Sequence, residues 1–98
     1  MIAGTWWFQI HKALRRGQND VKPFFVQIKC ELGKVYEVAT QIADAEIASE
    51  IYSTAGDYDL LIKFYADENT DIGHFVNEQV HRFGGVKDTY TIITFRAF

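Results

Sequence analysis

Residues 46–66 read EIASEIYSTAGDYDLLIKFYA, and this stretch decides the fold. It holds two apolar runs, residues 46–54 and 59–66, separated by the residues Ala55-Gly56-Asp57-Tyr58. Glycine and aspartate tolerate the positive φ angles that tight turns need. The stretch therefore predicts a β-hairpin, and its second strand is apolar on both faces.

The residues before the hairpin predict a strand and a helix. In residues 24–31, apolar and polar side chains alternate, which is typical of a half-buried strand. Pro23 comes just before that strand, where no backbone donor is needed. Residues 34–44 carry an apolar stripe at helical spacing. Its members are Val35, Val38, Ala39 and Ile42.

The residues after the hairpin predict a second helix and a fourth strand. We expect Asp67, Asn69 or Thr70 to cap the helix and Gly84-Gly85 to end it. Residues 86–95 alternate as a strand would. The apolar stripe of the helix is Ile72, Phe75, Val76, Val80 and Phe83.

This order is β-α-β-β-α-β, the ferredoxin-like arrangement of an α+β domain, with a four-stranded antiparallel sheet. Two helices cover only one face of such a sheet, and an open apolar face of that size marks an interface. We therefore expect at least a homodimer, joined sheet face to sheet face. The open face is expected to hold Leu61, Tyr65, Thr89, Ile93 and Phe95, or the alternate residues of these strands.

Composition and charge exclude several classes of function. The 98 residues are enough for one domain, with 48% hydrophobic and 23% charged residues. Residues 23–98 hold six basic and twelve acidic residues, and such an acidic body disfavours direct nucleic-acid binding. The single cysteine, Cys30, permits no intrachain disulfide and fits a reducing cytoplasm. No apolar run is long enough to span a membrane.

Residues 1–22 differ from the rest of the chain and are expected to be an extension of the domain at 23–98. Trp7, Ile10 and Leu14 share a helical face, and the segment has a net charge of +3. Three interpretations stay open: an extra helix docked on the domain, a basic amphipathic surface helix for a membrane or a partner, or a leader outside the working protein.

Two motifs carry a resemblance to a known family. The first is Ser53-Thr54-Ala55-Gly56-Asp57-Tyr58-Asp59, and the second is Gly84-Gly85-Val86-Lys87-Asp88-Thr89-Tyr90-Thr91. The chain here resembles the ligand-binding (RAM) domain of the Lrp/AsnC transcriptional regulators, which has a Thr-x-Gly-x-Tyr-Asp hairpin and a Gly-Val-x-x-Thr-x-Thr strand. The resemblance covers residues 23–98.

The resemblance implies a dimeric α+β barrel, often in higher homo-oligomers, that binds an amino-acid effector without a cofactor. It also implies that the protein is not an enzyme. In chemical terms, Asp59 could accept hydrogen bonds from an α-ammonium group. The alternative is that these residues serve the turn and the strand alone. The implied ligand-binding residues are Thr54, Gly56, Tyr58, Asp59, Thr89 and Thr91.

The chain departs from the family pattern in two places. The regulators carry a helix-turn-helix before this domain, and 22 residues are too few for one. We therefore expect a stand-alone domain that acts on transcription only through a DNA-binding partner, such as a full-length Lrp/AsnC regulator. The usual Pro-Gly-Val entry to the last strand is Gly84-Gly85-Val86 here.

Two other classes of function compete with this interpretation. One is a small cofactor-free enzyme of the monooxygenase or isomerase kind, since such enzymes use the same barrel, but fold analogy alone does not establish catalysis. The other is an ACT-type regulatory domain, for which Leu32-Gly33-Lys34 is a poor version of the expected glycine-rich turn. No metal site is expected, because His74 and His81 lie seven residues apart, about 10.5 Å along a helix.

Overall fold

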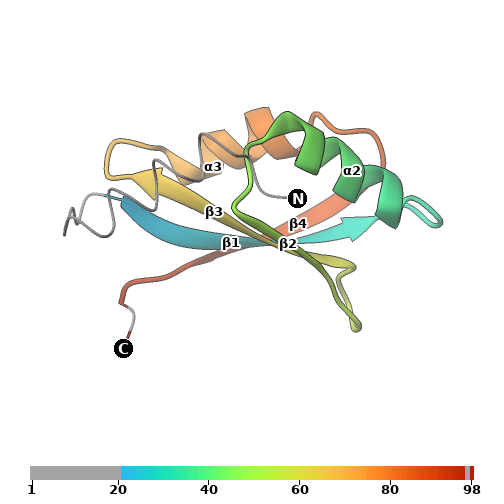
Figure 1. The fold of residues 1–98 in the computed structure, drawn as a ribbon, viewed down its shortest axis with the longest axis horizontal. Helices are drawn as coiled ribbons and strands as arrows, with labels where there is room; N and C mark the ends of the chain where they lie inside the picture. Colours follow the sequence, from blue (N-terminus) through green and yellow to red (C-terminus); the bar gives the residue numbers. More distant parts are fainter. Residues whose placement is uncertain (1–20, 97) are drawn as a thin grey trace.

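The computed structural model describes residues 21–96 and 98. The elements, in chain order, are β1 (Val21–Cys30), α2 (Val35–Ala45), β2 (Glu50–Ser53), β3 (Leu60–Asp67), α3 (Ile72–Phe75), the π-helical turn η1 (Val76–Val80) and β4 (Val86–Ile93). The strands form one antiparallel sheet in the order β2-β3-β1-β4. Both helical segments lie on one face of this sheet (Figure 1). The ferredoxin-like prediction is confirmed, and residues 1–20 of the expected N-terminal extension lie outside the described residues.

The core lies between the sheet and the helices. The alternation along the strands and the apolar stripes of the helices predicted this position. Alternate residues of β1 and β3 are buried, and so are Val38 and Ile42 of α2. From the second helical segment Val76 and Val80 are buried in the core. Ile72, Phe75 and Phe83 are partly buried and pack against the core cluster. The buried strand residues are Phe24, Val26, Ile28, Cys30, Leu60, Ile62 and Phe64.

The strand before the hairpin is shorter than its apolar pattern predicts. Glu46 has φ 56° and ψ 35°, so it ends α2 in the left-handed conformation instead of opening a strand. The strand β2 begins only at Glu50. The N–H of Ser49 already donates to the carbonyl of Lys63 at 2.8 Å, which brings the chain onto the edge of β3. The apolar side chains before Glu50 are therefore packing residues of a loop.

The second helical segment begins and ends differently from the prediction. Asp71 caps it, with its carboxylate accepting from the N–H of His74 at 3.1 Å. Asp67 instead stabilises the preceding turn, accepting from the N–H of Asn69 and the hydroxyl of Thr70. The segment then widens into η1, where the N–H of His81 donates to the carbonyl of Val76. A π-turn of this kind rotates the residues that follow it.

Pro23 lies inside β1, which begins at Val21 rather than at Phe24. Its carbonyl points toward β4, where it accepts from the hydroxyl of Thr94 at 2.6 Å. The nitrogen of Pro23, which carries no hydrogen, therefore also faces β4. Backbone pairing of β1 with β4 stops at the pair Phe24–Ile93, so no ladder hydrogen bond is lost at the proline.

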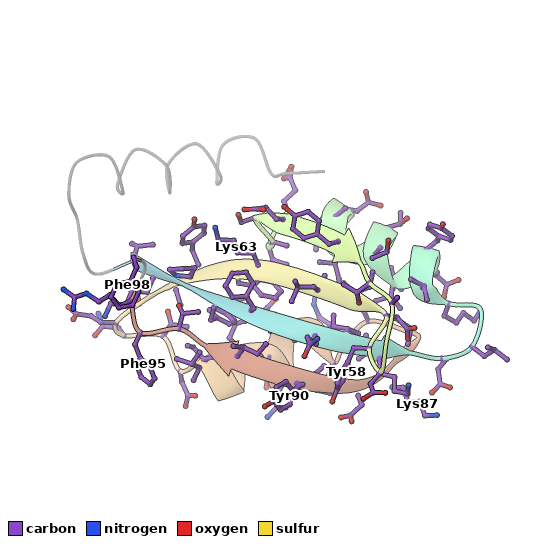
Figure 2. All side chains as sticks on the ribbon, turned by 90° about the horizontal axis from the view of Figure 1, so that it is seen from below. Tyr58, Lys63, Lys87, Tyr90, Phe95 and Phe98 are labelled. Atoms are coloured by element: carbon purple, nitrogen blue, oxygen red, sulfur yellow. The ribbon has the colours of Figure 1, made fainter. Side chains whose placement is uncertain are left out.

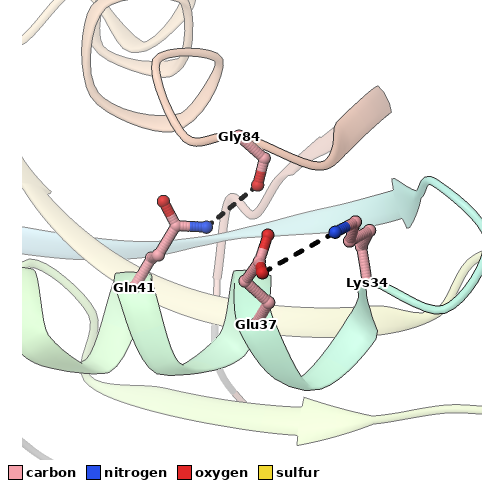
Figure 3. A network of polar contacts seen from close by, with 4 residues as sticks. All are labelled: Lys34, Glu37, Gln41 and Gly84. Carbon is pink, nitrogen blue, oxygen red and sulfur yellow. Dashed lines mark hydrogen bonds and ion pairs between the residues drawn. The ribbon is translucent and has the colours of Figure 1, made fainter.

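The loop between η1 and β4 is held against α2 (Figure 3). The side-chain amide of Gln41 donates to the carbonyl of Gly84 at 2.9 Å. The carbonyl of Gly85 accepts from the N–H of Glu31 at 2.7 Å. This loop thus joins the end of the helical layer to both α2 and the end of β1.

Strand pairing shows which residues of β4 face away from the helices. Thr89 and Ile93 pair with Ile28 and Phe24, which are buried in the core, so they lie on the helix-covered face. Of the two sets that the sequence left open for β4, the alternates Tyr90 and Ile92 are therefore the residues on the open face. Phe95 follows the end of β4 and is exposed. Leu61 and Tyr65 lie on the open face as predicted, opposite Gln27 and Pro23 of β1.

Candidate functional site

The β2–β3 hairpin is closed by its own backbone and by one threonine. The N–H of Thr54 donates to the carbonyl of Asp59 at 2.9 Å, and the Thr54 hydroxyl donates to the carbonyl of Tyr58 at 3.0 Å. Gly56 has φ 120°, a conformation that favours glycine. No atom lies within 4 Å of the position that a Cβ would take there, so the backbone at Gly56 is open to approach.

Asp59 joins the hairpin to the end of β1. Its N–H donates to the carbonyl of Ile28, and its carboxylate accepts from the N–H of Cys30 at 2.8 Å. β1 extends two residues beyond its last paired position on β3, Ile28 opposite Leu60, so the Asp59 side chain takes the place of a backbone acceptor. Burial, followed by the charge of Asp59, raises the pKa of the Cys30 thiol. Cys30 is therefore a buried, protonated core residue.

The contact of Asp59 with Cys30 predicts a measurable loss of stability. In Asp59→Ala the part-buried N–H of Cys30 has no acceptor, which we expect to cost about 1–3 kcal/mol of the free energy of unfolding. Asp57→Ala is the matched control, since only the main-chain carbonyl of Asp57 is engaged, by the Lys29 ammonium. Urea unfolding of both variants checks this. Equal midpoints for the two variants would show that the carboxylate of Asp59 has no structural role.

Tyr58 lies beside Tyr90 on the open side of the sheet. Their ring centroids are 6.1 Å apart with an interplanar angle of 34°. Figure 2 views the sheet from the side opposite the helices and shows Tyr58 and Tyr90 near each other, with Tyr90 on β4. Tyr90 is 56% exposed, so the aromatic pair presents apolar area to solvent.

The two threonines of the second motif lie on the other face of the sheet. Thr89 and Thr91 pair with Ile28 and Val26 on the helix-covered side. The hydroxyl of Thr89 lies 2.9 Å from Nε2 of His81. The six predicted ligand-binding residues thus form two groups, the hairpin with Tyr58 and the threonine strand with His81. In one protomer the ring of Tyr58, beside Tyr90, and the two threonines lie on opposite faces of the sheet.

His81 is a residue that the sequence interpretation did not place in this site. The π-turn ends at His81, and the loop with Gly84 and Gly85 returns the chain so that β4 passes beneath it. The sequence signal was a helix capped by two glycines followed by a strand. That signal predicts that the end of the helix lies near the start of the strand. It does not predict which side chain of the last helical turn contacts Thr89.

A second polar group lies on the open face at β2 and β3. The ammonium of Lys63 is 3.4 Å from the carboxylate of Glu50, which also accepts from the hydroxyl of Tyr52. The hydrogen bond from Tyr52 to Glu50, followed by the charge of Glu50, raises the pKa of Tyr52. Burial acts to lower the pKa of Lys63, but its interactions with Tyr65 and Glu50 outweigh this and raise it. These groups are polar anchors, and none of them is activated as a nucleophile.

The described residues contain no group of three or more histidine, cysteine or acidic side chains that could hold a metal ion. Across residues 21–96 and 98, no helix has the length and apolar character needed to cross a membrane.

Comparison with known proteins gives a consistent family assignment. A family model described as the Lrp/AsnC ligand binding domain matches residues 24–98. The HTH-type transcriptional regulator FL11 of Pyrococcus abyssi is 32% identical over 72 residues, which are 74% of this chain and 47% of the relative. The chain therefore spans about half the length of the curated relatives it matches.

Solved structures agree with this assignment. TTHA0845 from Thermus thermophilus is 28% identical, with a TM-score of 0.69, and the match covers 78% of this chain and 95% of that chain. A transcriptional regulator from Neisseria meningitidis, crystallised as a complex with L-Met, has a TM-score of 0.65 at 16% identity. That match covers 76% of this chain and 49% of the regulator and shows a shared fold.

Proposed function

Because this chain belongs to the Lrp/AsnC ligand binding domain family, we propose that residues 24–98 bind an amino-acid effector and self-associate. The family match carries this proposal, since it spans the sheet from Phe24 onward, both helical segments and the hairpin. The curated relatives are named as transcriptional regulators, which points away from an enzyme. The complex of the Neisseria regulator with L-Met supports an amino acid as the class of effector.

The geometry of the hairpin supports an effector site that is completed by a second protomer. The backbone at Gly56 is open to approach, and the carboxylate of Asp59 is fixed by the N–H of Cys30. Thr89 and His81 lie on the other face of the sheet. A ligand that contacts both groups needs surface from more than one chain. We therefore place the effector between protomers, with the hairpin of one of them supplying the Asp59 carboxylate.

The open face of the sheet is the surface that we propose for the homodimer. Its centre is apolar, with Phe25 and Leu61 half-buried and Tyr90 and Ile92 exposed. The ion pair of Glu50 with Lys63 lies at its β2 side. An exposed apolar patch with a polar margin is typical of a protein interface. A small domain also buries a smaller share of its surface on folding than a larger domain does, so association adds to its stability.

Regulation of transcription then depends on a DNA-binding partner. The two helical segments of the described residues are separated by β2 and β3, so they do not form a helix-turn-helix. Residues 23–98 carry six basic against twelve acidic residues, which disfavours contact with phosphate groups. In this proposal DNA is bound by a different polypeptide segment, such as that of a full-length Lrp/AsnC regulator. The single cysteine, Cys30, is buried and forms no disulfide, which is consistent with the proposal that the protein acts in a reducing cytoplasm.

The effector is tested by thermal unfolding of the full chain with each of the twenty amino acids. A ligand at about 100 times its dissociation constant adds roughly 2.7 kcal/mol to the free energy of unfolding. In a domain of this size each kcal/mol moves the melting midpoint by roughly 4–8 °C. We expect at least one amino acid to raise the midpoint by about 10 °C or more at that excess. Twenty unchanged midpoints at millimolar amino acid would contradict effector binding.

A further inference from the structure

A cavity of about 320 Å³ lies at the opposite end of the sheet from the hairpin, where β1 begins and β3 and β4 end. Part of its floor is apolar, with Ile93 from β4 and Ile72 from the start of α3. Ile93 pairs with the buried Phe24, so it faces the helical layer, yet it remains 55% exposed. An apolar group placed on Ile72 and Ile93 would remove this area from water.

The described part of the chain begins at this cavity. Lys22 and Pro23, at the start of β1, belong to its lining, so residues 1–20 join the domain at the cavity rim. Val21 is seven positions after Leu14, and seven residues span at most about 25 Å. The ten residues of β1 extend about 33 Å toward the hairpin end of the sheet. Leu14 can therefore reach the cavity but not the hairpin.

The sequence of this N-terminal segment complements the apolar floor. Trp7, Ile10 and Leu14 recur at helical spacing and share one face. The residues Gly17-Gln18-Asn19-Asp20 follow, and glycine, asparagine and aspartate favour turns. The segment thus has an apolar face that needs cover and a place to reverse direction before β1.

Charge complements the rim as well. Asp67 and Glu68 lie exposed at the end of β3 and line the cavity, and Lys22 is the one basic residue among the described lining residues. Asp67 is fixed in place, since it accepts from the backbone of the following turn at 3.0 Å and from a threonine hydroxyl at 2.9 Å. Arg15 and Arg16 directly follow Leu14. Opposite charges on the two surfaces favour one orientation of the segment over its reverse.

From this complementarity we propose that residues 1–20 are a docking segment that covers the cavity of their own domain. Ile10 and Leu14 pack on Ile72 and Ile93, and the two arginines after Leu14 lie beside the acidic rim. Exposed ion pairs contribute little free energy, so the apolar contact drives docking. A covalently attached segment has an effective concentration of about millimolar, so a weak contact is sufficient. The cavity lies on the helix-covered side, and docking there leaves the open sheet face free.

Tryptophan fluorescence of the full chain tests this docking, because Trp6 and Trp7 are its only two tryptophans. In buffer without lipid, we expect emission at shorter wavelength than N-acetyltryptophanamide and weaker quenching by acrylamide. Leu14→Glu should lower the docking equilibrium constant about tenfold or more, with a red shift and stronger quenching. Gln9→Glu is the matched control, since it adds the same charge away from the apolar face. Free-indole emission of the unaltered chain, or equal quenching of the two variants, would contradict the proposal.

Substitutions in the domain locate the contact. Ile93→Glu should shift the tryptophan emission as Leu14→Glu does, and circular dichroism checks that this variant is folded. Leu32→Glu, in the exposed loop after β1, is the control and should leave the emission unchanged. In nuclear magnetic resonance spectra, Leu14→Glu should move the backbone amide signals of Ala66 and Thr94. Unchanged emission in Ile93→Glu, or a blue shift that needs phosphatidylserine vesicles, would overturn the proposal.

Discussion

Replacing Phe64 with alanine is expected to remove about 3–5 kcal/mol from the free energy of unfolding. Phe64 is fully buried, and its ring centroid lies 5.3 Å from those of both Phe24 and Phe75. The ring of Phe24 stacks on it, and the ring of Phe75 meets it edge-on. One substitution therefore opens a cavity between β1, β3 and α3. Because the total free energy of unfolding of a native protein is about 5–15 kcal/mol, this loss is a large share of the stability.

Thermal unfolding followed by circular dichroism measures this effect. Tyr36→Ala is the matched control, since Tyr36 is an aromatic residue of α2 that is 86% exposed. We expect its midpoint to stay within a few degrees of the unaltered protein, because exposed positions contribute about 0.5 kcal/mol or less. A Phe64→Ala midpoint as high as that of Tyr36→Ala would show that the three rings are not the centre of the core.

Replacing Gly85 with alanine is the second large effect that we expect. Gly85 has φ 98°, and a Cβ at this position would lie 2.9 Å from Cγ2 of Val38 and 3.1 Å from Cβ of Lys34. Neither neighbouring atom is the far end of a flexible chain, so α2 or the loop must shift. Backbone strain and overpacking together are expected to cost about 2–4 kcal/mol. The shift would also loosen the hydrogen bond from Glu31 to the carbonyl of Gly85.

Gly84 provides the control for this prediction. It precedes Gly85 directly, its φ is not positive, and no atom lies within 4 Å of its hypothetical Cβ. Gly84→Ala should therefore stay within about 0.5 kcal/mol of the unaltered protein in urea unfolding. If both variants lose a similar amount of the free energy of unfolding, the close approach of the loop to α2 is not the reason that position 85 requires glycine.

The core could be predicted from sequence because burial follows the two structural periods. Phe24, Val26 and Ile28 alternate along β1, and Val38 and Ile42 are four residues apart on α2. Either pattern identifies the buried side of its element without knowledge of its neighbours. The start of β2 could not be predicted this way. Ile47 and Ala48, which lie between the left-handed cap Glu46 and the first strand residue Glu50, are as apolar as strand residues.

Which face of β4 is open could not be decided from the sequence, for a related reason. Its two sides are about equally apolar, since Thr89 and Ile93 alternate with Tyr90 and Ile92. The face is decided by pairing with β1, including the register shift between Lys29 and Cys30. Such a register depends on contacts between elements, which no local pattern contains. For the same reason the motifs could not show that Thr89 meets His81.

The mass of the protein in solution tests the central claim, that the open sheet face is a surface for self-association. Light scattering coupled to size-exclusion chromatography should give the full chain at least twice its protomer mass of 11.3 kDa. Ile92→Glu places a charge on that face opposite Phe25, and we expect a folded protein of one protomer mass. The control, Leu32→Glu, lies in the exposed loop after β1 and should keep the full mass. A mass of 11.3 kDa for the unaltered chain, or an unchanged oligomer in Ile92→Glu, would contradict the account.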